Sequence, residues 1–358
     1  MNNRNNINTS KQYYKNFSAA IAWLRFPLIF LIIMLHCYSV VKLDGPRIFY
    51  FEIIYPFSLW LGETGVPGFF FISGYLFFLS KKSYGQKLKS RVQTLLIPYM
   101  LWNSLLLALY LLAYLAGHPQ EINHKNIAEF SIIDYIRLFW DRGDFSDGNF
   151  VPLLCPFWYI RNLLIMSILS PLLYYIVKYG REFFLLVVTL WWMTLHHNAF
   201  IPQTVLFFSL GAYFSIMETN PLEMITNRRK TFVILFIVFA LADMATHTII
   251  SSPWNLQFHR LSLLFNIPIL LLLADYCARK GYSYNLLSNA AFIVFAVHYP
   301  IVVILRKMCT SSFPIASDGI HIVLYFLCVV VSTTTSLLIY IILDKYFPKL
   351  KKILSGNR

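Results

Sequence analysis

The sequence predicts an all-α membrane protein, a polytopic bundle of about ten transmembrane helices with both termini in the cytoplasm. Of its 358 residues 58% are hydrophobic and only 13% are charged, and the mean hydropathy is +0.60. The apolar residues form long runs that short clusters of Lys and Arg separate. This composition is typical of proteins that cross a membrane several times and excludes an ordinary soluble enzyme. The net charge of +14 could suggest a nucleic-acid partner, but basic clusters between apolar runs instead set membrane orientation.

The apolar runs are of the length that crosses a bilayer, which takes about 17 to 25 residues. The fifth and sixth are short and meet at His196 and His197, so they could instead form a re-entrant pair, which would leave both termini on one side. The ten expected helices cover residues 20–41, 58–80, 94–116, 153–177, 183–198, 200–217, 231–251, 259–278, 285–305 and 319–343.

Basic residues between these runs are distributed unequally, and this predicts the orientation. The segments on the side of the termini carry twenty Lys and Arg residues, the opposite segments carry eight, and Arg25 and Arg161 lie within helices. Because basic residues are retained on the cytoplasmic side, both termini are expected there.

The chain is expected to form one transmembrane domain over residues 20–345. The first nineteen residues form a polar tail without the apolar core or cleavage site of a signal peptide, and residues 346–358 form a basic cytoplasmic tail. Five scattered cysteines indicate neither a disulfide framework nor a zinc site.

The longest segment between spans, 117–152, is therefore expected outside the cell. Its stretch 127–140 mixes apolar and charged residues at helical spacing, which predicts a helix on the membrane surface or over a cavity. Asp141, Asp144 and Asp147 follow it and could coordinate a cation, but they lack a calcium-loop pattern, so a solvated turn is favoured.

The first apolar run contains the most informative pair of residues, Arg25 and His36. They are eleven positions apart, so they share one helix face at a separation of about 16 to 17 Å along the axis. Because an ionisable side chain facing lipid is costly, both are expected to face a shielded lumen that opens toward the cytoplasm. Alternatively, Arg25 extends to the headgroups and His36 is a satisfied interior histidine.

The second expected helix and the turn after it suggest a binding surface. Glycines and Ser73 alternate with aromatic residues over 62–77, which allows close approach of a backbone or an extended ligand, and Glu63 lies near the outer end. The following turn carries Lys81, Lys82, Lys87, Lys89 and Arg91. This cluster satisfies the orientation rule, but beside Arg25 it would also form a basic entrance suited to the phosphates of coenzyme A.

At this point the residues resemble a known family. The spacing of Arg25 and His36, the segment GVPGFFFISGYLF (65–77), the Arg91-led entry to Ile97-Pro98-Tyr99, FWYIRNLLIMSILSP (157–171) and FAVHYPIV (295–302) resemble the acyltransferase-3 family of bacterial integral membrane O-acyltransferases. The matches run in family order from about residue 20 to 345.

The resemblance implies transfer of an acyl group, usually acetyl, from cytoplasmic acetyl-CoA to a hydroxyl of a cell-envelope glycan, in the bacterial inner membrane and with no metal. It assigns catalysis to His36 and Arg25, and Arg91 matches the first arginine of a cytoplasmic pair. Thr94 stands where the family has the second arginine, so Lys87 and Lys89 are expected to substitute as point charges. Some members carry a fused extracytoplasmic domain; here a separate protein could take that role.

The chemistry of histidine is compatible with this assignment. A sugar hydroxyl needs a base, and imidazole can accept its proton at neutral pH. His36 could instead be acylated first as a nucleophilic relay. Cys37 is a poorer candidate because adjacent helical residues point about 100° apart.

Several other polar residues have both a functional and a structural interpretation. Arg161, beside Trp158, could bind the acceptor or only pair between helices. Asp243 and His247 share a helix face and could form a proton relay or satisfy each other. Together with Glu63 these four are the candidate acceptor-binding residues. His298 matches the family but could stabilise a kinked helix.

The sequence therefore favours a membrane O-acyltransferase that binds acyl-CoA through Arg25, Arg91, Lys87, Lys89 and Ser73. The alternative from another class is a transporter or flippase of a lipid-linked glycan, since buried charges and aromatic cavities also suit translocation. The pairs His196-His197 and Asp318-His321 lack a complete ligand set, so no metal is expected.

Overall fold

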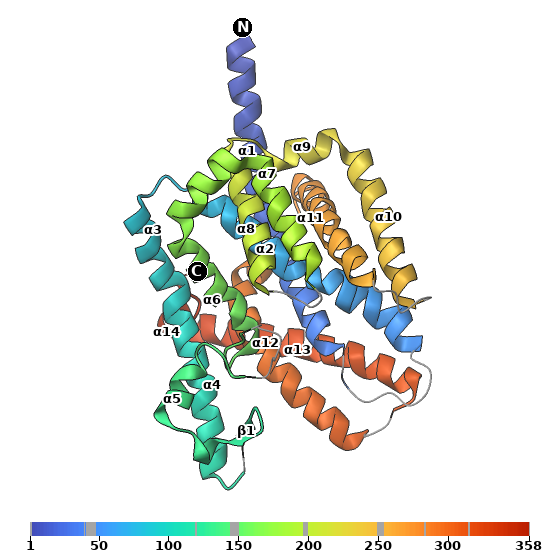
Figure 1. Ribbon diagram of the computed structural model, residues 1–358. Coiled ribbons are helices and arrows are strands. Elements are labelled where there is room, and N and C mark those ends of the chain that lie inside the picture. Colours follow the sequence, from blue (N-terminus) through green and yellow to red (C-terminus); the bar gives the residue numbers. More distant parts are fainter. Residues whose placement is uncertain are drawn as a thin grey trace.

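The computed structural model describes residues 2–38, 40, 48–118, 120–143, 150–195, 200–248, 254–282, 284–313 and 316–357. Described side chains begin at Phe17. Helices make up nearly all of the molecule (Figure 1). The α-helices are α1 (Asn2–Cys37), α2 (Gly65–Leu79), α3 (Tyr84–Arg91), α4 (Ile97–Leu115), α5 (Ile132–Arg137), α6 (Trp158–Ile168), α7 (Ser170–Thr194), α8 (Phe200–Ile216), α9 (Pro221–Asn227), α10 (Arg229–Thr248), α11 (Asn255–Arg279), α12 (Asn285–Ser312), α13 (Asp318–Tyr346) and α14 (Pro348–Leu354).

Shorter elements connect these helices. Two wider π-helical segments, η1 (Tyr50–Leu61) and η3 (Val92–Leu96), precede η2 and α4, and the tight turns are η2 (Gly62–Thr64), η4 (Ile127–Glu129) and η5 (Cys155–Phe157). The strands β1 (Glu121–Ile122) and β2 (Lys125–Asn126) pair antiparallel.

Within the described residues, six helices are long and apolar enough to cross a membrane, or up to eight when each bent pair is one span. The prediction of an all-α membrane bundle is confirmed, whereas a count of about ten is not. Helix length explains the difference: α2 has 15 residues and α8 has 17. At 1.5 Å per residue these helices are shorter than a hydrocarbon core of about 30 Å.

A break inside α7 matches the expected boundary between two runs. Arg181 has φ 45° and ψ −132°, so the helix turns over there, at the top of Figure 1. The sequence places the boundary between 177 and 183, where the apolar pattern is interrupted by charged residues. His196, His197 and Asn198 lie outside the described residues.

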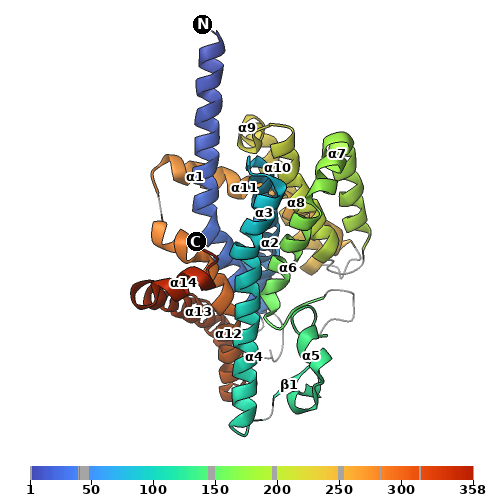
Figure 2. The ribbon, with the colours of Figure 1, turned by 90° about the vertical axis from the view of Figure 1, so that its left-hand side faces the viewer.

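Helix α1 forms the centre of the bundle. It contacts α2, α11, α12, α13, η1 and η2, and one face of it is buried through Leu24, Leu28 and Ile32. The polar segment that the sequence marks as a tail forms the start of the same helix and projects from the bundle (Figure 2).

Residues 120–143 form a small unit beside α4, at the opposite end of the molecule from the N-terminus (Figure 2). It has its own apolar cluster, in which Ile122 and Ile127 are buried. Helix α5 begins at Ser131, whose side chain forms a capping box with Asp134, and Lys125 binds the same carboxylate at 2.8 Å. These donors lower the pKa of Asp134 to about 2. The predicted helix in 127–140 is thus present but shorter.

The last residues form a packed helix, which differs from the tail that the sequence suggests. The Trp102 indole donates to the carbonyl of Leu354 at 3.0 Å, and Gly356 lies against the backbone of Thr94. Helix α14 lies against α13 and α4, and Lys351 binds Asp344 of α13 at 3.0 Å, while Leu350 and Ile353 stay exposed.

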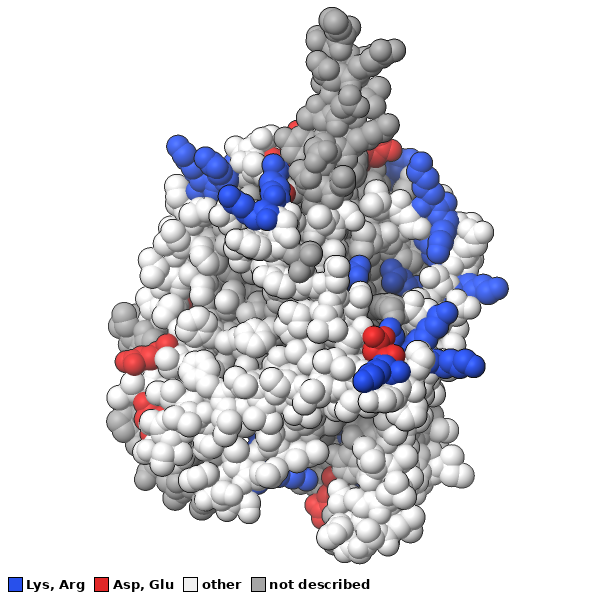
Figure 3. All heavy atoms as spheres, turned by 180° about the vertical axis from the view of Figure 1, so that it is seen from behind, with Lys and Arg blue, Asp and Glu red and all other residues white. Residues whose placement is uncertain are grey.

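Charged side chains are absent from a broad band on one face of the molecular surface (Figure 3). In the view from behind, Lys and Arg gather around the end at which α1 projects and near one edge, and a broad band is without them (Figure 3). This distribution is the one a membrane-embedded bundle requires.

Candidate active site

A cavity of about 370 Å³ lies between α1, α2, α6 and α12. This size falls in the usual range for small-molecule sites. Its polar lining includes three of the five residues that the sequence assigns to the donor, Arg25, Ser73 and Arg91, which come from separate places in the chain. Ser73 and Tyr159 share a hydrogen bond of 3.2 Å across it. The inner end is apolar and aromatic, with Phe69, Phe292 and Phe295 in its wall.

The basic side of this cavity is formed by α1 and α3, which contribute Arg25 and Arg91 to its lining. The ammonium of Lys87 lies 5.0 Å from the centre of the Phe77 ring, and the guanidinium of Arg91 lies 5.3 Å from the same ring. These cations are four residues apart and share a helix face. Lys89 is exposed on another side of α3, and neither it nor Lys87 lines the cavity. Thr94 donates to the carbonyl of Ser90 at 2.8 Å, so it caps the helix.

His36 lies deeper than the cavity, against α12. Its half-buried ring lies 5.4 Å from the ring of His298 and 5.0 Å from that of Tyr299. His298 is fully buried, and its Nδ1 lies 2.8 Å from the carbonyl oxygen of Phe295. Because that nitrogen donates to a carbonyl, Nε2 is the acceptor in the neutral ring. Within the described part of the chain, Nε2 is buried without a hydrogen-bond partner.

The cavity and His36 are connected through side chains and not through open space. Phe295 lines the cavity and lies 5.9 Å, centre to centre, from the His298 ring, which contacts His36. The sequence expects Arg25 and His36 to share one lumen. The structure places Arg25 in the cavity and His36 beyond its aromatic end.

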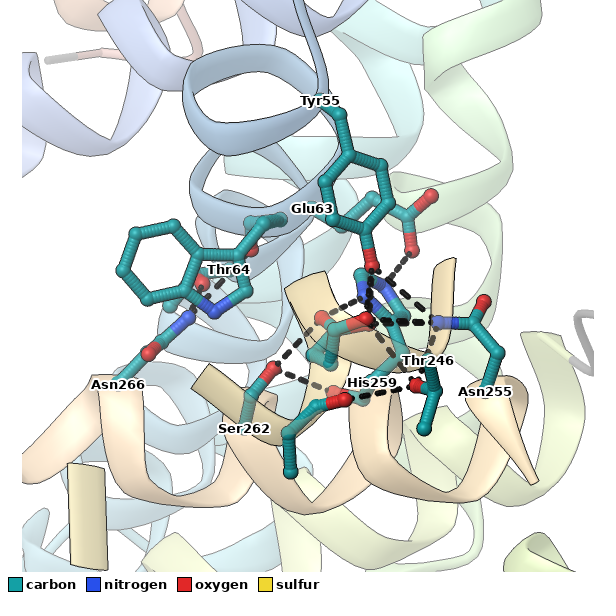
Figure 4. Close-up of polar contacts among 11 residues, drawn as sticks. Tyr55, Glu63, Thr64, Thr246, Asn255, His259, Ser262 and Asn266 are labelled. Carbon is teal, nitrogen blue, oxygen red and sulfur yellow. Dashed lines mark hydrogen bonds and ion pairs between the residues drawn. The ribbon is translucent and has the colours of Figure 1, made fainter. Parts of the chain in front are cut away.

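A second polar cluster joins η1, η2, α10 and α11 (Figure 4). The imidazole of His259 bridges two carboxylates: Nε2 is 3.0 Å from Glu63, and Nδ1 is 2.8 Å from Asp243. The Tyr55 hydroxyl and the Asn255 amide also donate to Asp243. Asp243 is fully buried, so these donors compensate its lost hydration.

This cluster corrects the expected pairing of Asp243 with His247. Both are on α10, but the partner of Asp243 is His259 on α11, and His247 instead stacks on the Tyr55 ring at 3.9 Å. Sequence reasoning missed His259 because its partners are 16 and 196 residues away. The signal that could have pointed to His259 is its position as a histidine inside an apolar run.

Arg161 and Trp158 have structural contacts. The guanidinium of Arg161 donates to the carbonyls of Trp140 and Phe150 at 2.6 and 2.8 Å, so it fastens the segments that contain these two residues to α6. The Trp158 ring stacks on Phe200 at 4.0 Å. Neither side chain, nor Glu63, Asp243 or His247, lines the cavity.

The candidate cation ligands also have other partners. Asp141 binds Arg137 at 2.9 Å, and Asp318 accepts the backbone N–H of Phe49 at 2.7 Å. His321 stacks on Phe49. Asp144 and Asp147 lie outside the described residues. Among the described side chains, no group of three or more His, Cys, Asp or Glu could hold a metal.

Comparison with known proteins identifies the family. The family model described as an acyltransferase domain, that of the acyltransferase-3 family, matches residues 18–341. The chain belongs to the acyltransferase-3 family. It is also 24% identical over 319 residues to the succinoglycan biosynthesis protein ExoH of Rhizobium meliloti (strain 1021), an alignment that covers 84% of this chain and 82% of that protein. No solved structure matches the chain.

As an acyltransferase-3 protein with several helices that can cross a membrane, the chain is a multi-pass membrane acyltransferase. The family motifs of the sequence meet in space: Arg25, Ser73 and Arg91 line one cavity, and His36 and His298 touch beyond its inner end.

Proposed function

We propose that the protein is an O-acyltransferase of the bacterial inner membrane that transfers an acyl group, acetyl in the simplest case, from cytoplasmic acyl-CoA to a hydroxyl of a cell-envelope glycan. The observation that carries this proposal is the cavity of about 370 Å³ whose entrance is basic and whose inner end is aromatic. An anionic head on an extended, mostly apolar arm is the ligand shape such a cavity fits.

In this proposal the donor lies along the cavity. Arg91, Lys87 and Arg25 bind phosphate oxygens, since guanidinium and ammonium groups form the strong, charge-assisted hydrogen bonds that phosphates accept. The Ser73–Tyr159 pair offers hydroxyls to the amides of the pantetheine arm. The thioester reaches the aromatic end near Phe295, and a rotation of that ring brings it to His36.

His36 is the proposed general base. Its imidazole accepts the proton of the acceptor hydroxyl, the oxygen attacks the thioester carbonyl, and the carbon–sulfur bond breaks. The leaving thiolate takes up a proton to give coenzyme A. In the relay version an imidazole nitrogen attacks first and passes the acyl group to the hydroxyl, directly or through a separate extracytoplasmic protein. His298, held by the Phe295 carbonyl, orients the His36 ring in either version.

The decisive experiment uses the purified protein in detergent with labelled acetyl-CoA and envelope glycan from the producing bacterium. A histidine base contributes about 10²- to 10⁴-fold to the rate, so His36→Ala should reduce coenzyme A release by at least about a hundredfold. Donor affinity, measured by calorimetry, should stay unchanged in this variant. Arg91→Ala should do the reverse and weaken donor binding first.

Full activity of His36→Ala with a verified acceptor would contradict the mechanism. If the wild-type protein neither binds acetyl-CoA nor releases coenzyme A, the transporter alternative is favoured. A comparison of glycan masses between cells with and without the protein then reports acyl type and acceptor together.

A further inference from the structure

The outer half of α12 carries a second hollow that the donor site does not use. It is an open groove of about 530 Å³, lined by Val303, Arg306, Lys307, Thr310 and Ser311. These five positions follow the spacing of a single helix face, so the groove runs along α12 toward its C-terminal end. Its polar groups are two cations and two hydroxyls, and no acidic residue is in its described lining.

Neither cation has an anionic partner among the described residues. In the described part of the chain, the side chains of Arg306 and Lys307 form no ion pair and no hydrogen bond. By comparison, Arg137 and Lys125 of the neighbouring outer unit both bind carboxylates. Arg306 and Lys307 are adjacent like charges and repel each other. An anion bound from outside would therefore stabilise them.

The groove lies on the face of α12 that also carries Tyr299, a neighbour of His36. Tyr299 is seven residues before Arg306, so the two share a face of α12 and lie about 10 Å apart along it. The Tyr299 ring contacts that of His36, and the Arg306 guanidinium is close enough to interact electrostatically with the same imidazole. His36 is therefore approached by the donor cavity past Phe295 and by this groove past Tyr299.

We propose that this groove binds an anionic group, a phosphate or a carboxylate, of the glycan acceptor and so directs a neighbouring hydroxyl to His36. The inference rests on the proposed function, because it concerns the second substrate of the same reaction. Arg306 supplies the planar fork that matches either oxyanion, Lys307 adds a point charge, and Ser311 can donate from the rim, whereas the Thr310 hydroxyl already donates to the Arg306 carbonyl at 2.6 Å. Acceptors without charge would be poor substrates.

Binding can be measured with defined probes. The purified protein in dodecyl maltoside is first saturated with coenzyme A, so that the donor cavity cannot take up the probe. It is then titrated calorimetrically with geranyl diphosphate against geraniol, and with glucuronate against glucose. The charged member of at least one pair should bind, and its partner should not. Binding of geranyl diphosphate indicates a phosphate site, and binding of glucuronate indicates a carboxylate site.

Variants assign the binding to the groove. Losing a charge-assisted hydrogen bond of about 1.5 kcal/mol or more corresponds to about tenfold, so Arg306→Gln should weaken probe binding at least tenfold and Lys307→Gln less. Arg306→Lys keeps the charge and should retain part of the affinity. Lys280→Gln is the matched control, because Lys280 is an exposed cation at the end of α11, outside both sites, and should change nothing.

A lipid headgroup is the other source of phosphate, and activity in vesicles distinguishes it. Acyl transfer to the native glycan is compared in phosphatidylcholine vesicles with and without phosphatidylglycerol. If the acceptor uses the groove, Arg306→Gln raises KM for the acceptor in both and leaves KM for acetyl-CoA unchanged. A defect confined to vesicles with phosphatidylglycerol assigns the groove to lipid and overturns the inference.

The inference and the proposed function fail separately. Equal probe binding by the wild-type protein, Arg306→Gln and Lys307→Gln, or none by the wild-type protein, overturns the groove assignment even when coenzyme A release depends on His36. Probe binding that depends on Arg306, together with an absence of coenzyme A release, removes the acyltransfer mechanism and leaves the anion site standing.

Discussion

Asp243 shows how the bundle tolerates a fully buried carboxylate. Four side chains donate to it, those of Tyr55, Asn255, His259 and Ser262. They come from η1 and α11, so the cluster ties α10 to both. His259 in turn binds Glu63, which is on η2, and the neighbouring Gly62 packs against Leu31 and Leu35 of α1. The network therefore supports the turn of α1 that precedes His36.

The pairing in this network can be tested with double-mutant cycles. Asp243→Asn combined with His259→Gln should show a coupling energy of about 1 to 3 kcal/mol, because the two side chains are in direct contact. Asp243→Asn combined with His247→Gln should show a smaller coupling energy, because these two side chains are linked indirectly, through Tyr55. Each free energy of unfolding is measured by titrating the detergent-solubilised protein with SDS. Equal coupling in both cycles would contradict the structure.

The sequence could single out a residue where its unusual character was visible in the surrounding segment. It could not do so where the residue's partners lie far away in the chain. Arg25 and His36 stand out because a charge in an apolar run has few explanations. Arg260 was not singled out, yet its guanidinium donates to the carbonyls of Trp192 and Leu195 and so caps the end of α7. Its partners are more than sixty residues away, and nothing in the local pattern names them.

At the level of elements, the closest helix contact is that between α2 and α8. A Cβ added to Gly74 would lie 2.0 Å from the carbonyl oxygen of Phe208, and one added to Gly211 would lie 2.0 Å from that of Phe71. Both glycines therefore allow backbone to meet backbone, as small residues do in membrane helix pairs. Since α2 carries Ser73, this contact also fixes one wall of the donor cavity.

Replacing either glycine should separate these helices. Gly74→Ala or Gly211→Ala should lower the free energy of unfolding by at least about 1 to 3 kcal/mol, because the clash is with backbone and cannot be relieved by a side-chain rotation. Gly319→Ala is the control, since the added Cβ would meet nothing within 4 Å. It should be neutral or slightly stabilising. The SDS titration used for the double-mutant cycles measures all three, and a neutral Gly74→Ala would remove the proposed role of close contact.

The sequence indicated this contact only in part. Glycines alternating with aromatic residues over 62–77 predict that something approaches α2 closely, but periodicity cannot name α8 as the partner. It likewise located an interruption near Arg181 and could not show that the chain there turns over inside one helix. A hydrophobic pattern with a period of 3.6 residues shows which face of a helix is buried. Which two helix faces pack together depends on the arrangement of all the helices.

At the level of the whole molecule, the positions of the basic residues and the arrangement of the helices distinguish the same two ends. The N-terminal helix projects at one end and the unit of residues 120–143 lies at the other (Figure 2). Helix α14 brings the C-terminus beside Thr94, three residues after Arg91 in the basic turn. The donor cavity, the basic turn and the C-terminal segment therefore lie together, and the groove of α12 lies beyond His36.

The arrangement of the helices and the distribution of charge both predict that the basic end of the molecule faces the cytoplasm. In a variant without the five native cysteines, Lys280→Cys and Asn357→Cys should react with a membrane-impermeant maleimide only after the inner membrane of spheroplasts is permeabilised. Glu129→Cys should react in intact spheroplasts. The reason is that retaining a basic cluster in the cytoplasm is favoured over moving it across, and the topology predicted from the sequence places twenty of the inter-helix cations on one side. Reaction of Lys280→Cys in intact cells would invert the molecule, which would turn the donor cavity away from cytoplasmic acyl-CoA and leave the groove of α12 facing the cytoplasm.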